Sequence, residues 1–482
     1  MEFALKLDYR KNVPLYRILA EAIKAAISSG QIAPGEELPS IRQMADMYCT
    51  SPATVIRCYD DLSSQGFLDT APRSKTRVSK NPPLDGENKT ADPAEPLRKT
   101  LEPAWSAHGK RLIEARKRSL SHKGVAIYNP GREDLPVAAW NKMILRHNKC
   151  YIQDDGALTY SADPFGHLRL REAVAAYLKR ARGINCDASN IVMSSNSRLD
   201  LIAKLLIDSG DRVIVEEPCY PAVRRILLSY GAELVPVPVD QDGILIDRFV
   251  NSGDRYKMIH LCPSHHDPTG AVLSMERRLE LLEWARDTGT FIFENDFDSH
   301  FRYGTKPIPA LKGLDGTGSV IYASSFWMAM GPLVRLGYLA VPQKFVATIE
   351  CLQDVVNRDI SVIEQYALTD FINEGFLERH VHRTRVKYTK RRQALIFALK
   401  TGLGDAVTIN KESAGMHLLV NFGAELSEER IEEAAKASDF FIKPTSDYYM
   451  TVPKEGEYII PFVGLDEATI EDTVRRFVAA LG

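Results

Sequence analysis

The segment GSVIYASSFWMAMGPLVRLGYLAVP, residues 318–342, contains two short runs rich in β-branched and aromatic residues on either side of a turn. Runs of this length, bounded by Gly and Pro, are typical of buried strands. Similar runs precede it: NIVMS, DRVIVEEP, AELVPVPV, YKMIHLCP and TFIFENDF, with helical stretches such as LRLREAVAAYLKRAR and SMERRLELLEWARDTG between them. This alternation predicts an α/β fold with a mainly parallel, doubly wound sheet.

Five loops follow these predicted strands directly. They read SSNSR, EEPCYP, CPSHHDPTG, ENDFD and YASSFWM. Ligands of doubly wound sheets bind at the carboxyl ends of the strands, so we expect the five loops to converge on one cleft.

Length and composition limit the remaining possibilities. A chain of 482 residues predicts two or three domains, and a net charge of −2 does not by itself indicate nucleic acid or membrane as a partner. No apolar run approaches the ~20 residues of a membrane span, and the N-terminus lacks a signal-peptide core. Seven scattered cysteines without a CxxC motif indicate reduced thiols. We therefore expect a cytoplasmic protein without a membrane partner.

One abrupt change in composition divides the chain. Residues 81–104, NPPLDGENKTADPAEPLRKTLEPA, are rich in Pro, Asp and Glu and poor in large apolar residues, as linkers are. We expect a small domain over residues 1–80, a linker over 81–109 and a large domain over 110–482.

The small domain has the pattern of a winged helix-turn-helix. An amphipathic run from Leu15 ends at Gly30, and Ser40 can cap a second helix. Ser51 can cap a third, with Pro52 at its favoured first position. A basic hairpin follows Gly66.

The third helix and the hairpin are the predicted DNA-binding surface. Short polar side chains and cations at the start of a recognition helix suit base edges and phosphates, and cations along a wing suit the backbone. The candidate residues are Arg42, Ser51, Thr54, Arg57, Arg73, Lys75 and Arg77. The alternative is a three-helix interaction domain with a solvated run of charge.

Residues 14–68 resemble the DNA-binding domain of GntR-family bacterial regulators along their whole length. The shared positions are Gly35, Leu38, Pro39, Ser40, Arg42, Ala45, Ser51, Thr54, Val55, Tyr59, Leu62 and Gly66. The resemblance implies a double-stranded DNA operator as partner. Two departures, Pro52 where the family usually has Arg and a wing without glycine, leave the operator sequence open.

The large domain resembles the fold-type I aminotransferase-like domain of MocR-type GntR regulators. The motifs that carry the resemblance are YSADPFGHLRLREAVAAYLKRARGI, VEEPCYP, PSHHDPTGAVLSMERRLELLEWAR, FENDFDSHFRY and VRLGYLAVP. It implies a smaller C-terminal α+β subdomain and a head-to-tail homodimer.

Compared with that family, this chain has different residues at several positions around the cofactor. The family's lysine that binds pyridoxal phosphate (PLP) covalently lies seven residues before Arg335, where this chain has Met328. Asn295 replaces the Asp that partners the pyridine nitrogen, and Phe297 replaces a tyrosine. No Arg lies near EYIIPFVGL, where the family grips a substrate carboxylate. Without the amine no covalent link to PLP forms and transamination has no starting species, so we expect no catalytic residues.

What remains is a candidate effector pocket in place of an active site. Its predicted residues are Asn196, Ser197, Arg198, Tyr220, Asn295, Phe297, Ser324, Ser325, Met328 and Arg335. The cations and hydroxyls suit a small anion. We expect no cofactor, with PLP only as a non-covalent ligand. The alternatives are a cleft filled by side chains, a PLP-dependent aminotransferase fused to a DNA-binding domain, and a constitutive DNA-binding scaffold.

Two further patterns have ordinary explanations. The adjacent His265 and His266 lack the spacing of metal ligands on a helix, so we predict no metal site. The basic run ERHVHRTRVKYTKRR is interpreted as a solvated helix face, with DNA contact as the alternative.

Overall fold

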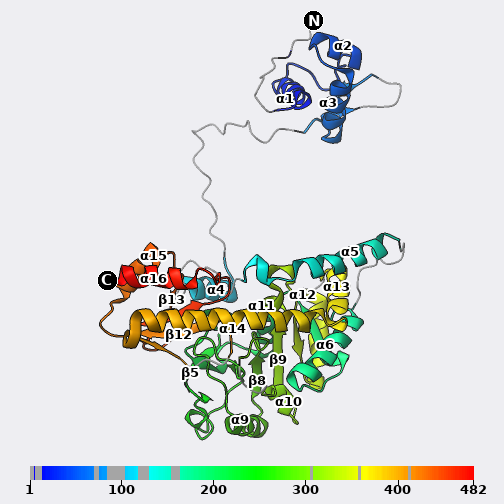
Figure 1. Ribbon diagram of the computed structural model, residues 1–482. Helices are drawn as coiled ribbons and strands as arrows, with labels where there is room; N and C mark the ends of the chain where they lie inside the picture. The colour runs from blue at the N-terminus through cyan, green and yellow to red at the C-terminus, as the bar shows by residue number, and fades with distance from the viewer. Residues whose placement is uncertain are drawn as a thin grey trace. The chain divides into compact units, whose positions relative to one another are not determined.

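The computed structural model describes residues 5, 13–69, 75–83, 104–117, 130–153, 163–303, 308–356, 360–410 and 414–482 (Figure 1). The chain forms two compact units, Met1–Pro103 and Ala104–Gly482. Most of the predicted linker, residues 84–103, lies outside the described residues. Helix α4 (Ala107–Lys117) begins inside the predicted linker and packs on α8 (Pro221–Tyr230).

The small unit contains three helices and a two-stranded hairpin. Their bounds are α1 Leu15–Ser28, α2 Ile41–Met47, α3 Pro52–Ser64, β1 Leu68–Asp69 and β2 Arg77–Val78. Ser40 caps α2 in a capping box with Gln43, and the Ser51 hydroxyl accepts from the Thr54 N–H at the start of α3. The predicted winged helix-turn-helix is thus the observed fold.

A compact apolar core holds the three helices together. Ile23 of α1, Val55 and Leu62 of α3, and Val78 of the hairpin have no accessible surface. The Tyr59 hydroxyl donates to the Pro39 carbonyl across 2.8 Å, which ties α3 to the turn before α2. These contacts fix the orientation of α3, at whose N-terminal half lie three of the predicted DNA-binding residues, Ser51, Thr54 and Arg57.

The large unit is built on an eight-stranded sheet with the order β3-β10-β9-β8-β7-β4-β5-β6. Strands β5, β4, β7, β8 and β9 run parallel, whereas β10 lies antiparallel between β3 and β9. The bounds are β3 Ile191–Ser194, β4 Arg212–Glu217, β5 Glu233–Asp240, β6 Gly243–Ile244, β7 Met258–Leu261, β8 Phe291–Asn295, β9 Val320–Ser325 and β10 Gly337–Ala340. Each of the seven predicted strands is present, and the predicted mainly parallel sheet is confirmed.

Helices cover both faces of this sheet. Successive strand residues point to opposite faces: Tyr322 packs in a cluster with α5, α6 and α13, whereas Ile321 packs in another with α7, α8 and α12. The bounds are α5 Val137–Gln153, α6 Leu168–Arg182, α7 Arg198–Leu206, α9 Met275–Thr288, α10 Leu311–Leu314, α11 Trp327–Met330, α12 Val346–Val356 and α13 Val362–Asn373. The unit is therefore doubly wound.

A smaller α+β subdomain completes the large unit. Its antiparallel sheet has the order β11-β12-β14-β13 and packs with α14, α15 and α16 around one apolar cluster. The bounds are α14 Phe376–Leu403, β11 Val407–Ile409, β12 His417–Phe422, α15 Glu428–Ser438, β13 Lys443–Pro444, β14 Glu457–Pro461 and α16 Ile470–Leu481. Figure 1 shows α14 running from this subdomain toward α13 and α6. Among the described residues no helix is long and apolar enough to cross a membrane.

A buried ion pair ties these layers together beside the ends of the strands. Arg182, the last residue of α6, donates from Nε to Asp296 Oδ2 across 2.7 Å, and both side chains are almost wholly buried. The Tyr322 hydroxyl of β9 and the Ser299 hydroxyl donate to the same carboxylate oxygen. Burial alone would raise the pKa of Asp296, but the Arg182 guanidinium and the hydroxyl donors outweigh it, so the pKa lies below its usual value.

We predict that Asp296→Asn destabilises the large unit at neutral pH by about 3–5 kcal/mol, because Arg182 is left buried without its counter-charge. A carboxylate with a lowered pKa stabilises the fold above its unfolded pKa of about 3.9 and loses that contribution as pH falls. The deficit should therefore shrink below about pH 4.

The measurement is urea denaturation followed by tryptophan fluorescence, since all four tryptophans lie in the large unit. Asp405→Asn, at an exposed position, is the control and should leave stability within about 0.5 kcal/mol. Equal stability of the two variants would contradict the role given to the ion pair.

Candidate functional site

The start of α3 presents small side chains to solvent. Ser51, Pro52 and Ala53 are exposed and Thr54 is half-buried. The Ser51 and Thr54 hydroxyls lie 2.8 Å apart, and Ser51 Oγ also accepts the Thr54 N–H at 3.2 Å. Both hydroxyls already take part in the helix cap. The exposed cations Arg42 and Arg57 are therefore the stronger candidates for DNA contact.

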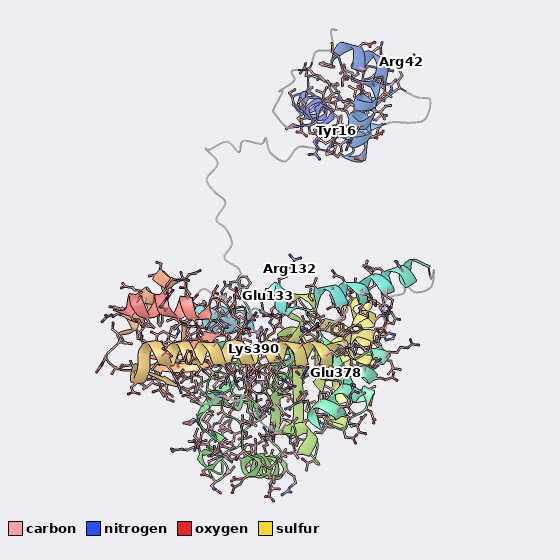
Figure 2. The ribbon with its side chains drawn as sticks, in the orientation of Figure 1. Tyr16, Arg42, Arg132, Glu133, Glu378 and Lys390 are labelled. Carbon is pink, nitrogen blue, oxygen red and sulfur yellow. The ribbon has the colours of Figure 1, made fainter. Side chains whose placement is uncertain are left out.

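Two of the predicted DNA-binding arginines lie exposed on the helices of the small unit. The Arg57 guanidinium sits 4.2 Å from the centre of the Tyr16 ring of α1, a cation–π arrangement that restrains its long side chain. Arg42 lies exposed in the first turn of α2, and Figure 2 labels both Arg42 and Tyr16. Tyr16 was not among the predicted residues. Its contact with Arg57 depends on the packing of α1 against α3.

The wing cations share one acidic partner. Lys75 Nζ donates to Glu37 Oε2 at 2.6 Å, and Arg77 donates to Glu37 Oε1 and to the Gly35 carbonyl. Hydrogen bonds from Lys75 and the charges of both cations lower the pKa of Glu37. The third predicted wing cation, Arg73, lies outside the described residues. Glu37 therefore competes with phosphate for Lys75 and Arg77.

In the large unit, a cavity of about 380 Å³ lies at the ends of the sheet strands. Each of the five loops predicted to converge contributes at least one lining residue. The lining residues are Ser195, Arg198, Tyr220, Cys262, Asp267, Asn295, Phe297, Ser325, Trp327, Met328, Arg335 and Leu336. The cleft is open space rather than a region filled by side chains.

Seven of the ten predicted pocket residues line this cavity, and three do not. The Ser197 hydroxyl caps α7 by accepting the Asp200 N–H at 3.3 Å. The Ser324 hydroxyl donates to the Asp296 carbonyl at 2.7 Å. Asn196 accepts from Arg198 through its backbone carbonyl at 3.2 Å. These three residues shape the loops, and their predicted side-chain role in the pocket is not supported by the geometry.

Alternate residues of ENDFD reach the cavity, at the end of β8 and in the loop that follows it. Asn295 and Phe297 line it, while Asp296 between them turns inward to Arg182. The Glu294 carboxylate accepts the Leu311 and Lys312 N–H groups at the start of α10, and Asp298 lies 2.7 Å from His265. The acidic residues of the segment thus serve the fold, and the cavity receives an amide and a phenyl ring.

The cavity has a cationic side and an apolar side. Burial lowers the pKa of the Arg198 guanidinium, which contacts the backbone at Gly337 so closely that a Cβ there would lie 2.8 Å from Nη1. Arg335 is exposed at the rim. On the other side, Met328 is half-buried and packs against the apolar cluster of the C-terminal subdomain. An anion beside Arg198 and an apolar body beside Met328 would match this surface.

Five lining residues were not predicted from the sequence. Among them, Asp267 is the one with a carboxylate. Its side chain is buried and belongs to the loop after β7. The loop was predicted to reach the cleft, but nothing in the residue order tells which of its side chains turns inward. Cys262 lies in the same loop, and burial raises the pKa of its thiol well above the usual value.

The neighbouring histidines hold loops together. His265 Nδ1 contacts Asp298, and the two ring nitrogens of His266 contact the Thr269 hydroxyl and the Pro218 carbonyl. Burial lowers the pKa of His266 to about 3, so its ring is neutral at physiological pH. No group of three His, Cys, Asp or Glu side chains in the described part of the chain is arranged to hold a metal ion.

Comparison with known proteins gives matches to both units. Residues 15–78 match the model of bacterial regulatory proteins of the gntR family, and residues 126–461 match aminotransferase class I and II. The probable rhizopine catabolism regulatory protein MocR of Rhizobium meliloti is 30% identical over 484 residues, covering 99% of this chain and 95% of that protein.

A further relative is the pyridoxine biosynthesis transcriptional regulator PdxR of Corynebacterium glutamicum. It is 29% identical over 386 residues, which cover 78% of this chain and 76% of that protein. Among solved structures, a multiple substrate aminotransferase from Thermococcus profundus superposes with a TM-score of 0.67 at 24% identity, covering 78% of this chain and 97% of that chain. The last likeness establishes the fold alone.

We predict that Glu37→Gln strengthens DNA binding a few-fold at low salt, because Lys75 and Arg77 lose their competing partner. The gain should decrease at high salt. The measurement is fluorescence anisotropy of a labelled duplex. Glu36→Gln removes the same charge one residue away, where the carboxylate accepts the Ala33 N–H; an equal gain in both variants would show an effect of net charge alone.

Arg57→Ala should weaken operator binding by about 1–3 kcal/mol if the guanidinium meets a base or a key phosphate. Arg17→Ala is the matched control, since Arg17 is exposed and also contacts Tyr16, through its hydroxyl at 3.1 Å. Affinity unchanged by Arg57→Ala in the same anisotropy assay would remove Arg57 from the interface.

Proposed function

Because the chain belongs to the MocR-type GntR-family transcription regulators, and so is a DNA-binding regulator with an aminotransferase-like unit, we propose that this unit senses a small anionic molecule and does not catalyse transamination. The observation that carries the proposal is the open cavity, which has the half-buried Arg198 guanidinium on one side and Met328 on the other.

The residues present do not fit a covalently held PLP. PLP chemistry requires a lysine amine to bind its aldehyde and an acidic partner for its ring nitrogen. Among the described residues that line the cavity none is a lysine, and the side chains at the two positions are Met328 and Asn295. Asp296, the carboxylate next to Asn295, is occupied by Arg182. Neither requirement is met, which supports a non-catalytic pocket.

The same cavity retains groups that bind anions. Arg198, Arg335, Ser195 and Ser325 all line it. A guanidinium binds phosphate or carboxylate through two parallel hydrogen bonds, and a partly buried site strengthens them. The ligand class that we propose therefore carries a phosphate, carboxylate or sulfonate beside an apolar or aromatic body.

Regulation requires the ligand to favour one arrangement of the protein over another. We propose that the large unit forms a head-to-tail homodimer, as the aminotransferase-like fold implies, so that two small units read a repeated or palindromic site. His380 of α14 lies 2.7 Å from the Ala329 carbonyl of α11, the short helix that carries Met328. A ligand beside Met328 thus has a direct contact through which it can act on α14.

A second candidate is PLP as a non-covalent effector. It is favoured by the relative whose name assigns it to pyridoxine biosynthesis and by the anion-binding side of the cavity. This candidate shares the cavity with the first and differs only in the ligand.

The test is titration of the purified protein with PLP and, separately, with inorganic phosphate and pyrophosphate. We expect no visible absorption band from a covalent PLP adduct, and a rise in melting temperature with at least one anion. Arg198→Ala combined with Arg335→Ala should abolish that rise, while Lys204→Ala combined with Arg248→Ala, at exposed positions outside the cavity, should retain it.

Each other outcome has a defined meaning. A borohydride-trapped PLP adduct at a mapped lysine would overturn the non-catalytic proposal. Stabilisation that survives the double Arg substitution would place the ligand elsewhere. No stabilisation by any of the three anions would favour a constitutive scaffold.

A further inference from the structure

Helix α14 concentrates positive charge that the rest of the chain does not share. Phe376–Leu403 carries eight Lys or Arg side chains against one carboxylate, a net charge of +7, in a chain whose total is −2. Helix surfaces usually mix both signs, so this excess requires a physical account.

Some of the cations of α14 form ion pairs within the large unit. Arg391 pairs with the buried Asp134, and Lys387 lies 3.5 Å from the same carboxylate and donates to the Glu133 carbonyl. The single carboxylate of the helix, Glu378, pairs with Arg180 of α6. The nearby acids are therefore already engaged and do not neutralise the outward side of the helix.

Three of the four exposed cations of α14 lie on one side of the helix: Arg379, Arg383 and Lys390, which we call the α14 stripe. Their spacing places them within about 40° of one another around the helix and spreads them over about 16 Å along it. Arg379 stacks 4.7 Å from the centre of the Phe376 ring and donates to the Glu374 carbonyl. Figure 2 shows Lys390 on the same helix as Glu378. The stripe is a row of cations along one side of α14.

We infer that the α14 stripe binds the phosphate backbone of DNA that flanks the site read by the winged helix. This inference rests on the DNA-binding function and extends it to the large unit. Backbone phosphates are closely spaced charges that a row of Lys and Arg side chains can neutralise without reading bases. Burying the stripe in an apolar partner would instead leave its charges without counter-charge.

The test compares wild type with Arg379→Gln/Arg383→Gln/Lys390→Gln on labelled random-sequence duplexes of about 15 and about 60 base pairs over a range of salt concentrations. On the long duplex, the triple variant should bind more weakly and lose about one unit of salt slope per phosphate contact, or about 3 per chain. The loss should be smaller on the short duplex, which offers little DNA beyond the winged helix. Lys204→Gln/Arg248→Gln/Arg255→Gln, at exposed positions on other elements, should leave the slope unchanged.

Circular dichroism and thermal melting check that the triple variant is folded. If it is not, Arg383→Gln/Lys390→Gln tests the same stripe and should lose about 2 units of slope. An unchanged slope on the long duplex overturns the inference, as does an equal loss on both duplexes. Loss of binding to anionic phospholipid vesicles with unchanged DNA binding would assign the stripe to a membrane surface and also overturn it. If wild type binds neither duplex, the DNA-binding function itself fails, which separates the two conclusions.

Discussion

The arrangement of the large unit depends on one buried ion pair, Arg182 with Asp296. The pair joins the end of α6 to the end of β8, and hydroxyl donors from Tyr322 and Ser299 complete the carboxylate's shell. Two buried charges are tolerated only when their hydrogen-bonding groups are satisfied, and here they are. Asp296 is held on the side of Arg182, while its neighbours Asn295 and Phe297 line the cavity.

This constraint determines which side chains the cavity presents to a ligand. The aminotransferase-like scaffold is retained, with its sheet order, its C-terminal subdomain and its loops at the strand ends. The surface of the cavity presents an amide, a phenyl ring and a thioether at Asn295, Phe297 and Met328. The anion-sensing role that we propose relies on Arg198, which lines this cavity close to the backbone at Gly337.

The two units use charge in a related way. In the small unit, Glu37 engages the described wing cations, so DNA must compete for them. In the large unit, Asp134 and Glu133 engage the inner cations of α14 and leave the outer ones to solvent. In both cases the net charge of an element exceeds the charge that is available to a partner. Some of its charged side chains already form ion pairs within the fold.

The sequence by itself determined the elements and their order. Strand runs, helix caps at Ser40 and Ser51 and the linker composition are local signals, and the strands and helices follow them. The loops at the cavity were also predictable, since parallel strands end at the same edge of a sheet. The tertiary structure alone decided which side chain of each loop faces the cavity. Asp267 lines it, whereas the Ser324 hydroxyl donates to the Asp296 carbonyl, 28 residues away in the chain, a contact that the residue order does not show. The Ser197 hydroxyl is instead engaged locally, as the cap of α7.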